Sequence, residues 1–82
     1  MKIEERAKLI VEEQLHVKIR TDGEKLFDMG ADSFDLIEIA NELEDKFEIK
    51  IENEELSNEL TVRDVVRMVR RKVEKTNETQ TT

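Results

Sequence analysis

The sequence contains no cysteine and no proline, and its 82 residues include only two glycines and three aromatic residues, all phenylalanine. Without cysteine the chain can form neither a disulfide framework nor a cysteine-based metal site, so any thiol chemistry must come from an attached group. The absence of proline and the scarcity of glycine remove the commonest helix breakers. Charged residues, many of them strong helix formers, make up 43% of the chain. The composition therefore favours one small all-helical domain.

Long hydrophobic runs are also missing, because no stretch approaches the roughly 18 residues that a membrane-spanning helix needs. The amino-terminal segment alternates charged and apolar residues and lacks the apolar stretch of a signal peptide. The formal net charge of -7 disfavours nucleic acid and anionic membranes as partners and favours basic protein surfaces. We therefore expect a cytoplasmic monomer, or the mature form of an imported protein, that neither binds nucleic acid nor inserts into membranes.

Apolar periodicity predicts three longer helices, over residues 3–15, 33–47 and about 61–75, and a short helical turn near Asn53. Residues 16–32 form a long first loop whose apolar residues are expected to hold it against the core. The fold class is therefore a small all-α four-helix bundle with a long first loop. Residues 1–75 make up the domain, and residues 76–82, which lack apolar side chains, are predicted to be a disordered tail.

Each predicted helix carries an apolar stripe that should face the core. The residues expected to point inward are Leu36, Ile37, Ala40, Leu43 and Phe47 in the second helix, Ile49, Ile51 and Leu56 around the short turn, and Val62, Val65, Val66, Val69 and Val73 in the last.

Residues for catalysis or metal binding are scarce. His16 is the single histidine, and it stands at a predicted helix end without a cysteine or second histidine as partner. The acidic loop from Asp28 does not fit a calcium loop, because its sixth residue is Ser33 instead of glycine and its twelfth is Ile39 instead of glutamate. We expect neither intrinsic catalysis nor a metal site.

Ser33 follows a glycine turn and Asp32, and it opens the most clearly periodic helix. A serine in that place is usually a helix cap. A phosphodiester on its oxygen would also lie beside unpaired backbone N–H groups at the positive end of the helix. Because the hydroxyl has no neighbouring base in the sequence, another enzyme would have to activate it.

Charge is distributed unevenly between the last two long helices. Residues 33–48 carry six acids and one base, a net charge of -5, whereas residues 61–75 carry six bases and two acids, a net charge of +4. Most such runs are solvated helix faces. The acids nevertheless follow Ser33 directly, where they would steer basic partners toward it through weak, salt-sensitive contacts.

The segment Gly30-Ala31-Asp32-Ser33-Phe34-Asp35 resembles the Gly-x-Asp-Ser-Leu signature of acyl carrier proteins. The segments 3–6, 13–18, 43–51 and 60–64 resemble flanking parts of the same family, so that the resemblance extends over about residues 3–73. It implies a four-helix bundle in which a phosphopantetheinyl transferase uses coenzyme A to attach 4'-phosphopantetheine at Ser33. The terminal thiol of that arm would hold acyl groups as thioesters.

The resemblance also implies two further sets of functional residues. Partner enzymes with basic docking surfaces would contact Asp32, Phe34, Asp35, Glu38, Glu44, Asp45 and Glu48. The acyl chain would enter the core beside Ile37, Ala40, Leu43 and Phe47.

The sequence departs from the family pattern at several places. Phe34 replaces the usual leucine, Asn41 replaces an apolar residue, Lys46 interrupts the acidic run and Glu52 replaces a common proline. We therefore predict an acyl carrier for fatty-acid or for specialised lipid or polyketide synthesis. The alternatives are a carrier of aminoacyl groups, either peptidyl or D-alanyl, and an unmodified carrier-like module that binds proteins. A small hydrolase or metal protein is disfavoured by the scarcity of histidine and cysteine.

Overall fold

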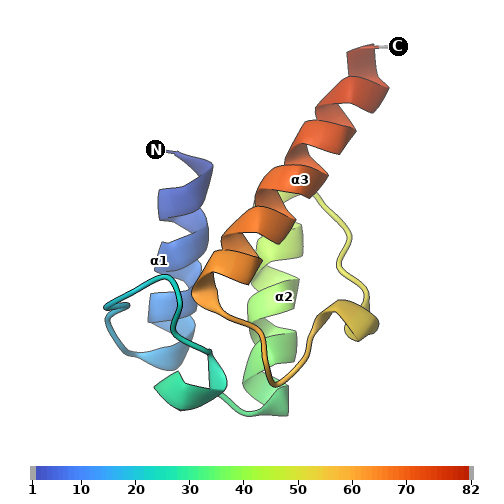
Figure 1. Cartoon of the computed structure of the whole chain (residues 1–82). Coiled ribbons are helices and arrows are strands. Elements are labelled where there is room, and N and C mark those ends of the chain that lie inside the picture. Colours follow the sequence, from blue (N-terminus) through green and yellow to red (C-terminus); the bar gives the residue numbers. More distant parts are fainter. Residues whose placement is uncertain (1, 82) are drawn as a thin grey trace.

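The computed structural model describes the backbone of residues 2–81 and the side chains of residues 2–75. Its elements are α1 (Ile3–Leu15), η1 (Phe27–Met29), α2 (Ser33–Phe47), η2 (Asn53–Glu55) and α3 (Val62–Thr81), where η denotes a single 3-10 turn. The all-helical prediction is confirmed. In the described part of the chain the only β-type pairing is an isolated bridge between Lys25 and Thr61. α2 begins at the end of the bundle opposite to the start of α1 and the end of α3 (Figure 1).

Three details of the element prediction change. The short helix expected near Asn53 is one 3-10 turn, and a second turn, η1, lies in the first loop where none was predicted. α3 is assigned to Thr81, beyond the predicted end near Lys75. The predicted disordered tail over residues 76–82 concerns residues whose side chains lie outside the described part, so it stays a prediction.

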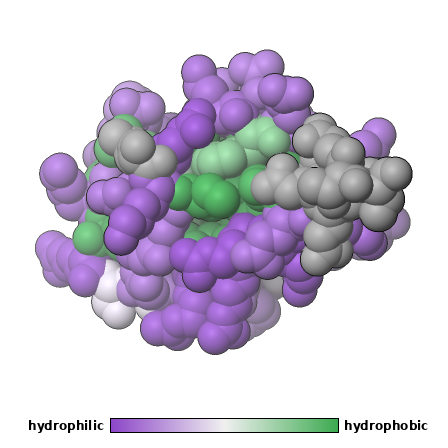
Figure 2. Space-filling model, turned by 90° about the horizontal axis from the view of Figure 1, so that it is seen from above, coloured by the Kyte–Doolittle hydropathy of each residue, from purple (hydrophilic) through white to green (hydrophobic). Residues whose placement is uncertain are grey.

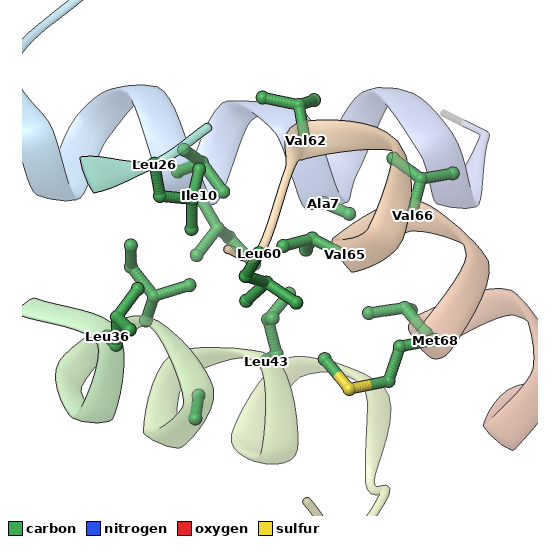
Figure 3. Packing of buried hydrophobic residues seen from close by; sticks show 14 of the residues in the cluster. Ala7, Ile10, Leu26, Leu36, Leu43, Leu60, Val62, Val65, Val66 and Met68 are labelled. Atoms are coloured by element: carbon green, nitrogen blue, oxygen red, sulfur yellow. The ribbon is translucent and has the colours of Figure 1, made fainter. Parts of the chain in front are cut away.

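The hydrophobic core lies where the inner faces of α1, α2 and α3 meet (Figure 3). Leu26 from the first loop is fully buried among the helices, which confirms that the loop is held against the core. Viewed along the bundle from above Figure 1, hydrophobic residues appear at the centre, and mostly hydrophilic residues surround them (Figure 2). The buried residues are Ala7, Ile10, Val11, Leu26, Ala31, Leu36, Ile39, Ala40, Leu43, Ile51, Leu60, Val62, Val65, Val66, Met68 and Val69.

The predicted inward stripe of α2 is wrong at one position. Ile37 is 45% exposed, whereas Ile39, which was not predicted, is 2% exposed. At about 100° per residue, Ile39 lies roughly 60° from the line through Leu36 and Ile37 lies roughly 100° from it on the other side. The helix therefore buries Ile39 and leaves Ile37 at the edge of the surface.

The first loop is fastened to the segment that enters α3. The Leu26 N–H donates to the Leu60 carbonyl at 3.0 Å, and the Val62 N–H donates to the Glu24 carbonyl at 3.0 Å. These bonds flank the bridge between Lys25 and Thr61. Because both loops are tied together, the chain that leads into α2 has a defined position.

α1 and α2 end in the same way. Each helix stops at a residue in the left-handed conformation, His16 with φ 57° and Glu48 with φ 54°. The Glu12 carboxylate then accepts a hydrogen bond from the Ile19 N–H at 2.8 Å, and the Glu44 carboxylate accepts one from the Ile51 N–H at 2.8 Å. Each glutamate thus holds the chain as it turns back along the bundle.

Glu44→Ala should lower the free energy of unfolding by about 1 kcal/mol or more, because a partly buried N–H loses its charged acceptor. The matched control is Glu42→Ala, which removes an exposed glutamate from the same helix and changes helix propensity equally. Urea unfolding of both variants measures the difference. Equal stabilities would show that the bond from Ile51 contributes nothing.

Surface ion pairs connect α1 with the first loop and with α3. The Lys8 ammonium lies 3.0 Å from the Glu4 carboxylate and 2.9 Å from the Asp22 carboxylate, and the Arg70 guanidinium lies 3.2 Å from Glu4. The hydrogen bond from Lys8 lowers the pKa of Glu4 and is also the main cause of the lowered pKa of Asp22. The ionised form of each carboxyl therefore stabilises the folded state.

Lys8→Gln should be less stable than the wild type near pH 7, and this difference should shrink on acidification. A carboxyl with a lowered folded-state pKa contributes stability above its ordinary value, here 4.5 for Glu4 and 3.8 for Asp22, and loses it as the pH falls through the lowered pKa. Urea unfolding of both proteins across this range measures the effect. A difference that is constant with pH would contradict it.

Candidate functional site

Ser33 is the first residue of α2, and the helix is capped by its neighbour. The Asp32 carboxylate accepts a hydrogen bond from the Asp35 N–H at 2.9 Å, and the Asp35 carboxylate accepts one from the Asp32 N–H at 3.1 Å. This reciprocal arrangement is a capping box. The cap is therefore Asp32, so the Ser33 hydroxyl is not needed for capping, and Ser33 is exposed.

The turn before Ser33 is held by its backbone. Gly30 adopts φ 103°, a conformation that residues with a side chain rarely take. The Gly30 N–H donates to the Phe27 carbonyl at 3.3 Å, and the Ala31 N–H donates to the Leu26 carbonyl at 3.1 Å. Ala31 is buried, and Leu26 is fixed in the core. Ser33 thus projects from a short, fastened turn.

The start of α2 can accept a phosphodiester. No hydrogen bond within the described chain occupies the N–H groups of Ser33 and Phe34, which lie at the positive end of the helix dipole. The Asp32 and Asp35 carboxylates occupy the same turn, but each already accepts a backbone N–H. A phosphate joined to the Ser33 oxygen would therefore find free donors beside it.

A groove of about 480 Å³ opens next to Ser33, between α2 and the segment that contains η2. One wall is apolar, and Asn53 and Asn58 bring two amides to the groove. Sequence reasoning assigned no site role to these asparagines, because no local pattern indicates that the chain returns to Ser33 there. The groove is lined by Phe27, Ser33, Leu36, Ile37, Asn53, Leu56 and Asn58.

The residues predicted to line an acyl pocket are separated by the structure. Ile37 lines the groove beside Ser33. Ala40 and Leu43 are buried in the packed core, at 5% and 1% exposure. Phe47 packs at the edge of the core, where the Arg6 guanidinium lies 5.0 Å from its ring centroid.

Three of the residues predicted to contact partners form hydrogen bonds that hold the fold, and three others lie apart from Ser33. Asp32 and Asp35 cap α2, and Glu44 holds the Ile51 N–H. Asp45 and Glu48 are exposed at the far end of the helix from Ser33. Glu38 instead faces a second hollow of about 220 Å³ between α1 and α2, together with Glu13 and Glu42. The acidic surface therefore includes part of α1 as well as α2. The charge pattern of α2 alone does not indicate this.

Three large apolar side chains are exposed around Ser33. Phe34 is 67% exposed, Ile37 is 45% exposed and Phe27 is 36% exposed. Phe27 and Ile37 line the groove that Ser33 also lines. Exposed apolar residues that gather at one place mark contact sites more often than isolated ones do.

Among the described residues, no group of three or more His, Asp or Glu side chains is arranged to hold a metal ion. No described helix combines the length and the hydrophobicity needed to cross a membrane.

The sequence matches a known protein family. Residues 5–69 match the family described as the phosphopantetheine attachment site. The match covers all of α2, both 3-10 turns and most of α1. Members of this family carry the 4'-phosphopantetheine prosthetic group. The chain belongs to the phosphopantetheine attachment site family of carrier domains.

Proposed function

We propose that Ser33 is the residue to which 4'-phosphopantetheine is attached, and that the chain is an acyl carrier without catalytic activity of its own. The proposal rests on the separate roles of two neighbouring residues at the start of α2. Asp32 caps the helix, and the exposed Ser33 is left beside free N–H groups. A transferase can then reach the hydroxyl without disturbing the fold.

The attachment would be a phosphoryl-group transfer from coenzyme A. The Ser33 oxygen forms a bond to the phosphorus nearest to pantetheine, and the pyrophosphate bond breaks, so that 3',5'-ADP leaves. The hydroxyl proton would pass to a base of the transferase, because the neighbouring Asp32 and Asp35 carboxylates already accept backbone hydrogen bonds in the helix cap and the groove lining includes no carboxylate, histidine or lysine. The role of this chain is to present the hydroxyl and to hold the product phosphate at the helix start.

Once bound, the group supplies a thiol that carries an acyl chain as a thioester. The groove beside Ser33 is within reach of anything joined to that residue, since Ser33 itself lines it. Leu36 and Ile37 provide apolar contacts there. Ala40, Leu43 and Phe47 would take part only if the core opened to admit the acyl chain.

Basic partner enzymes are proposed to approach along the acidic surface of α1 and α2, and to contact the apolar residues around Ser33. Glu38, Asp45 and Glu48 supply charge, and Phe34 supplies exposed apolar area. Exposed charges of this kind raise the rate of encounter more than they raise affinity. The chain is proposed to act as a cytoplasmic monomer in fatty-acid or specialised lipid or polyketide synthesis.

An aminoacyl carrier is the second candidate, and the groove supports it. Asn53 and Asn58 present side-chain amides to the space beside Ser33. Amides can pair with the amino and carbonyl groups of an aminoacyl cargo, whereas a saturated acyl chain offers them no hydrogen-bonding group.

The proposed function is tested by incubating the full chain with coenzyme A and a promiscuous phosphopantetheinyl transferase, followed by intact mass measurement. The expected result is the addition of one phosphopantetheine group per chain. A chain that stays unmodified while a control carrier is fully loaded would favour the unmodified protein-binding module.

A further inference from the structure

A hollow beside α3 is lined in part by Arg67 and Arg71 and is called the basic hollow here. It encloses about 390 Å³ between α3 and the segment that leads into it. Leu60 and Met68, which are largely buried, provide apolar surface in it, and Arg67 and Arg71 are exposed beside them. Its lining residues are Glu55, Leu60, Asp64, Arg67, Met68 and Arg71.

The two carboxylates in this hollow are already engaged. Asp64 accepts a hydrogen bond from the Thr61 N–H at 3.1 Å as part of the α3 cap. Glu55 accepts one from the Glu52 N–H at 2.9 Å and pairs with Lys72 at 3.0 Å. The pKa of Glu55 is lowered, first by that backbone bond and then by Lys72, with a smaller contribution from Arg71.

Arg67 and Arg71 are the two basic residues of α3 that line this hollow. Arg70 pairs with Glu4, and Lys72 pairs with Glu55. Within the described residues, neither Arg67 nor Arg71 forms a salt bridge. They stand four positions apart, a spacing at which like charges destabilise a helix by about 0.2–0.5 kcal/mol. Asp64, three positions before Arg67, and Glu55, whose pKa Arg71 helps to lower, offset part of this cost. Both guanidinium groups nevertheless stay exposed to a partner.

We propose that this hollow binds an acidic segment of a partner protein, in which two carboxylates flank an apolar side chain. The planar guanidinium groups of Arg67 and Arg71 can each hold a carboxylate through two parallel hydrogen bonds. Leu60 and Met68 would receive the apolar side chain. A partner bound here leaves α2 and Ser33 uncovered, so that one protein can hold the carrier while another acts on its cargo.

A second copy of the chain is the less suitable occupant. A contact between α3 of one copy and the acidic surface of another, unless it is reciprocated, is heterologous and produces rings or open chains instead of a closed dimer. It would also cover the acidic surface proposed for enzymes. The net charge of -7 on each copy opposes such association.

The test is a fluorescence anisotropy titration of the full, unmodified chain against a fluorescein-labelled peptide of Glu-Leu-Glu repeats. Wild type should bind saturably, and added salt should weaken binding. Arg67→Gln/Arg71→Gln should weaken binding by about tenfold or more, as expected when charge-assisted contacts are lost. Arg67→Lys/Arg71→Lys should bind more tightly than the glutamine double variant but more weakly than wild type, because lysine keeps the charge but lacks the planar guanidinium group.

The matched control is Arg20→Gln/Lys50→Gln, which removes the same charge from exposed positions elsewhere and should change the dissociation constant by less than about twofold. Absence of saturable binding by wild type, or equal losses in the two double variants, would overturn the proposal. Sedimentation showing that the chain self-associates through Arg67 and Arg71 would also overturn it, in favour of a second copy. Because the titration uses unmodified protein, its outcome does not depend on attachment at Ser33.

Discussion

Ser33→Ala should abolish the attachment of phosphopantetheine completely, because no other atom at the start of α2 can replace the lost hydroxyl oxygen as nucleophile. The fold should be unaffected, since Asp32 and Asp35 cap the helix and the serine side chain is not needed for capping. Intact mass measurement after incubation with coenzyme A and a transferase should show no adduct, and thermal unfolding should match that of the wild type within about 0.5 kcal/mol.

The chain supplies its own control for this experiment. Ser57 is the other serine in the sequence, and its hydroxyl accepts a hydrogen bond from the Glu59 N–H at 3.2 Å in the loop before α3. Ser57→Ala should therefore be loaded as the wild type is. Modification of Ser33→Ala, or its loss in Ser57→Ala alone, would place the attachment elsewhere.

Leu43→Ala should lower the free energy of unfolding by about 2–5 kcal/mol, the usual cost of removing a buried leucine side chain. Leu43 is 1% exposed and points from the last part of α2 toward Leu60 and Val65 in the core (Figure 3). A domain of this size is stabilised by only about 5–10 kcal/mol, so the change removes a large share of its stability. Urea unfolding followed by far-UV circular dichroism measures the loss.

Ile37→Ala provides the comparison on the same helix. Ile37 also loses an aliphatic side chain, but it is 45% exposed, so we expect a loss of about 1 kcal/mol or less. This pair also tests the orientation of α2. If Ile37→Ala cost as much as Leu43→Ala, Ile37 would face the core as the sequence pattern first indicated.

The orientation of α2 shows which buried residues a periodic sequence pattern can predict. Leu36, Ala40 and Leu43 recur at helical spacing, and their burial was predicted correctly. Ile37 and Ile39 lie on opposite edges of that stripe, and both are apolar. Which edge is buried depends on where α1 and α3 pack against α2, because they determine which flank of the helix is covered.

The acidic residues of α2 show that a charge pattern does not reveal which carboxylates form hydrogen bonds within the fold. Glu38, Glu44 and Asp45 look equivalent in a list of charges. Only the structure reveals that Glu44 is bound to the Ile51 N–H, whereas Glu38 shares a hollow with Glu13 of α1. The difference arises because a carboxylate can accept a hydrogen bond only from a backbone segment that the fold returns to it.

The sequence by itself determined the helical class, the bounds of the first two helices and the unusual serine at the start of the second. These features are local: helical spacing and an Asp-Ser pair after a glycine turn can be read over a few residues. Tertiary structure alone decided the groove beside Ser33 and the basic hollow at Arg67 and Arg71. The groove joins residues as far apart as Phe27 and Asn58, and the hollow joins the segment from Glu55 with α3. Neither can be read from local spacing, because the tertiary fold sets how these segments lie against one another.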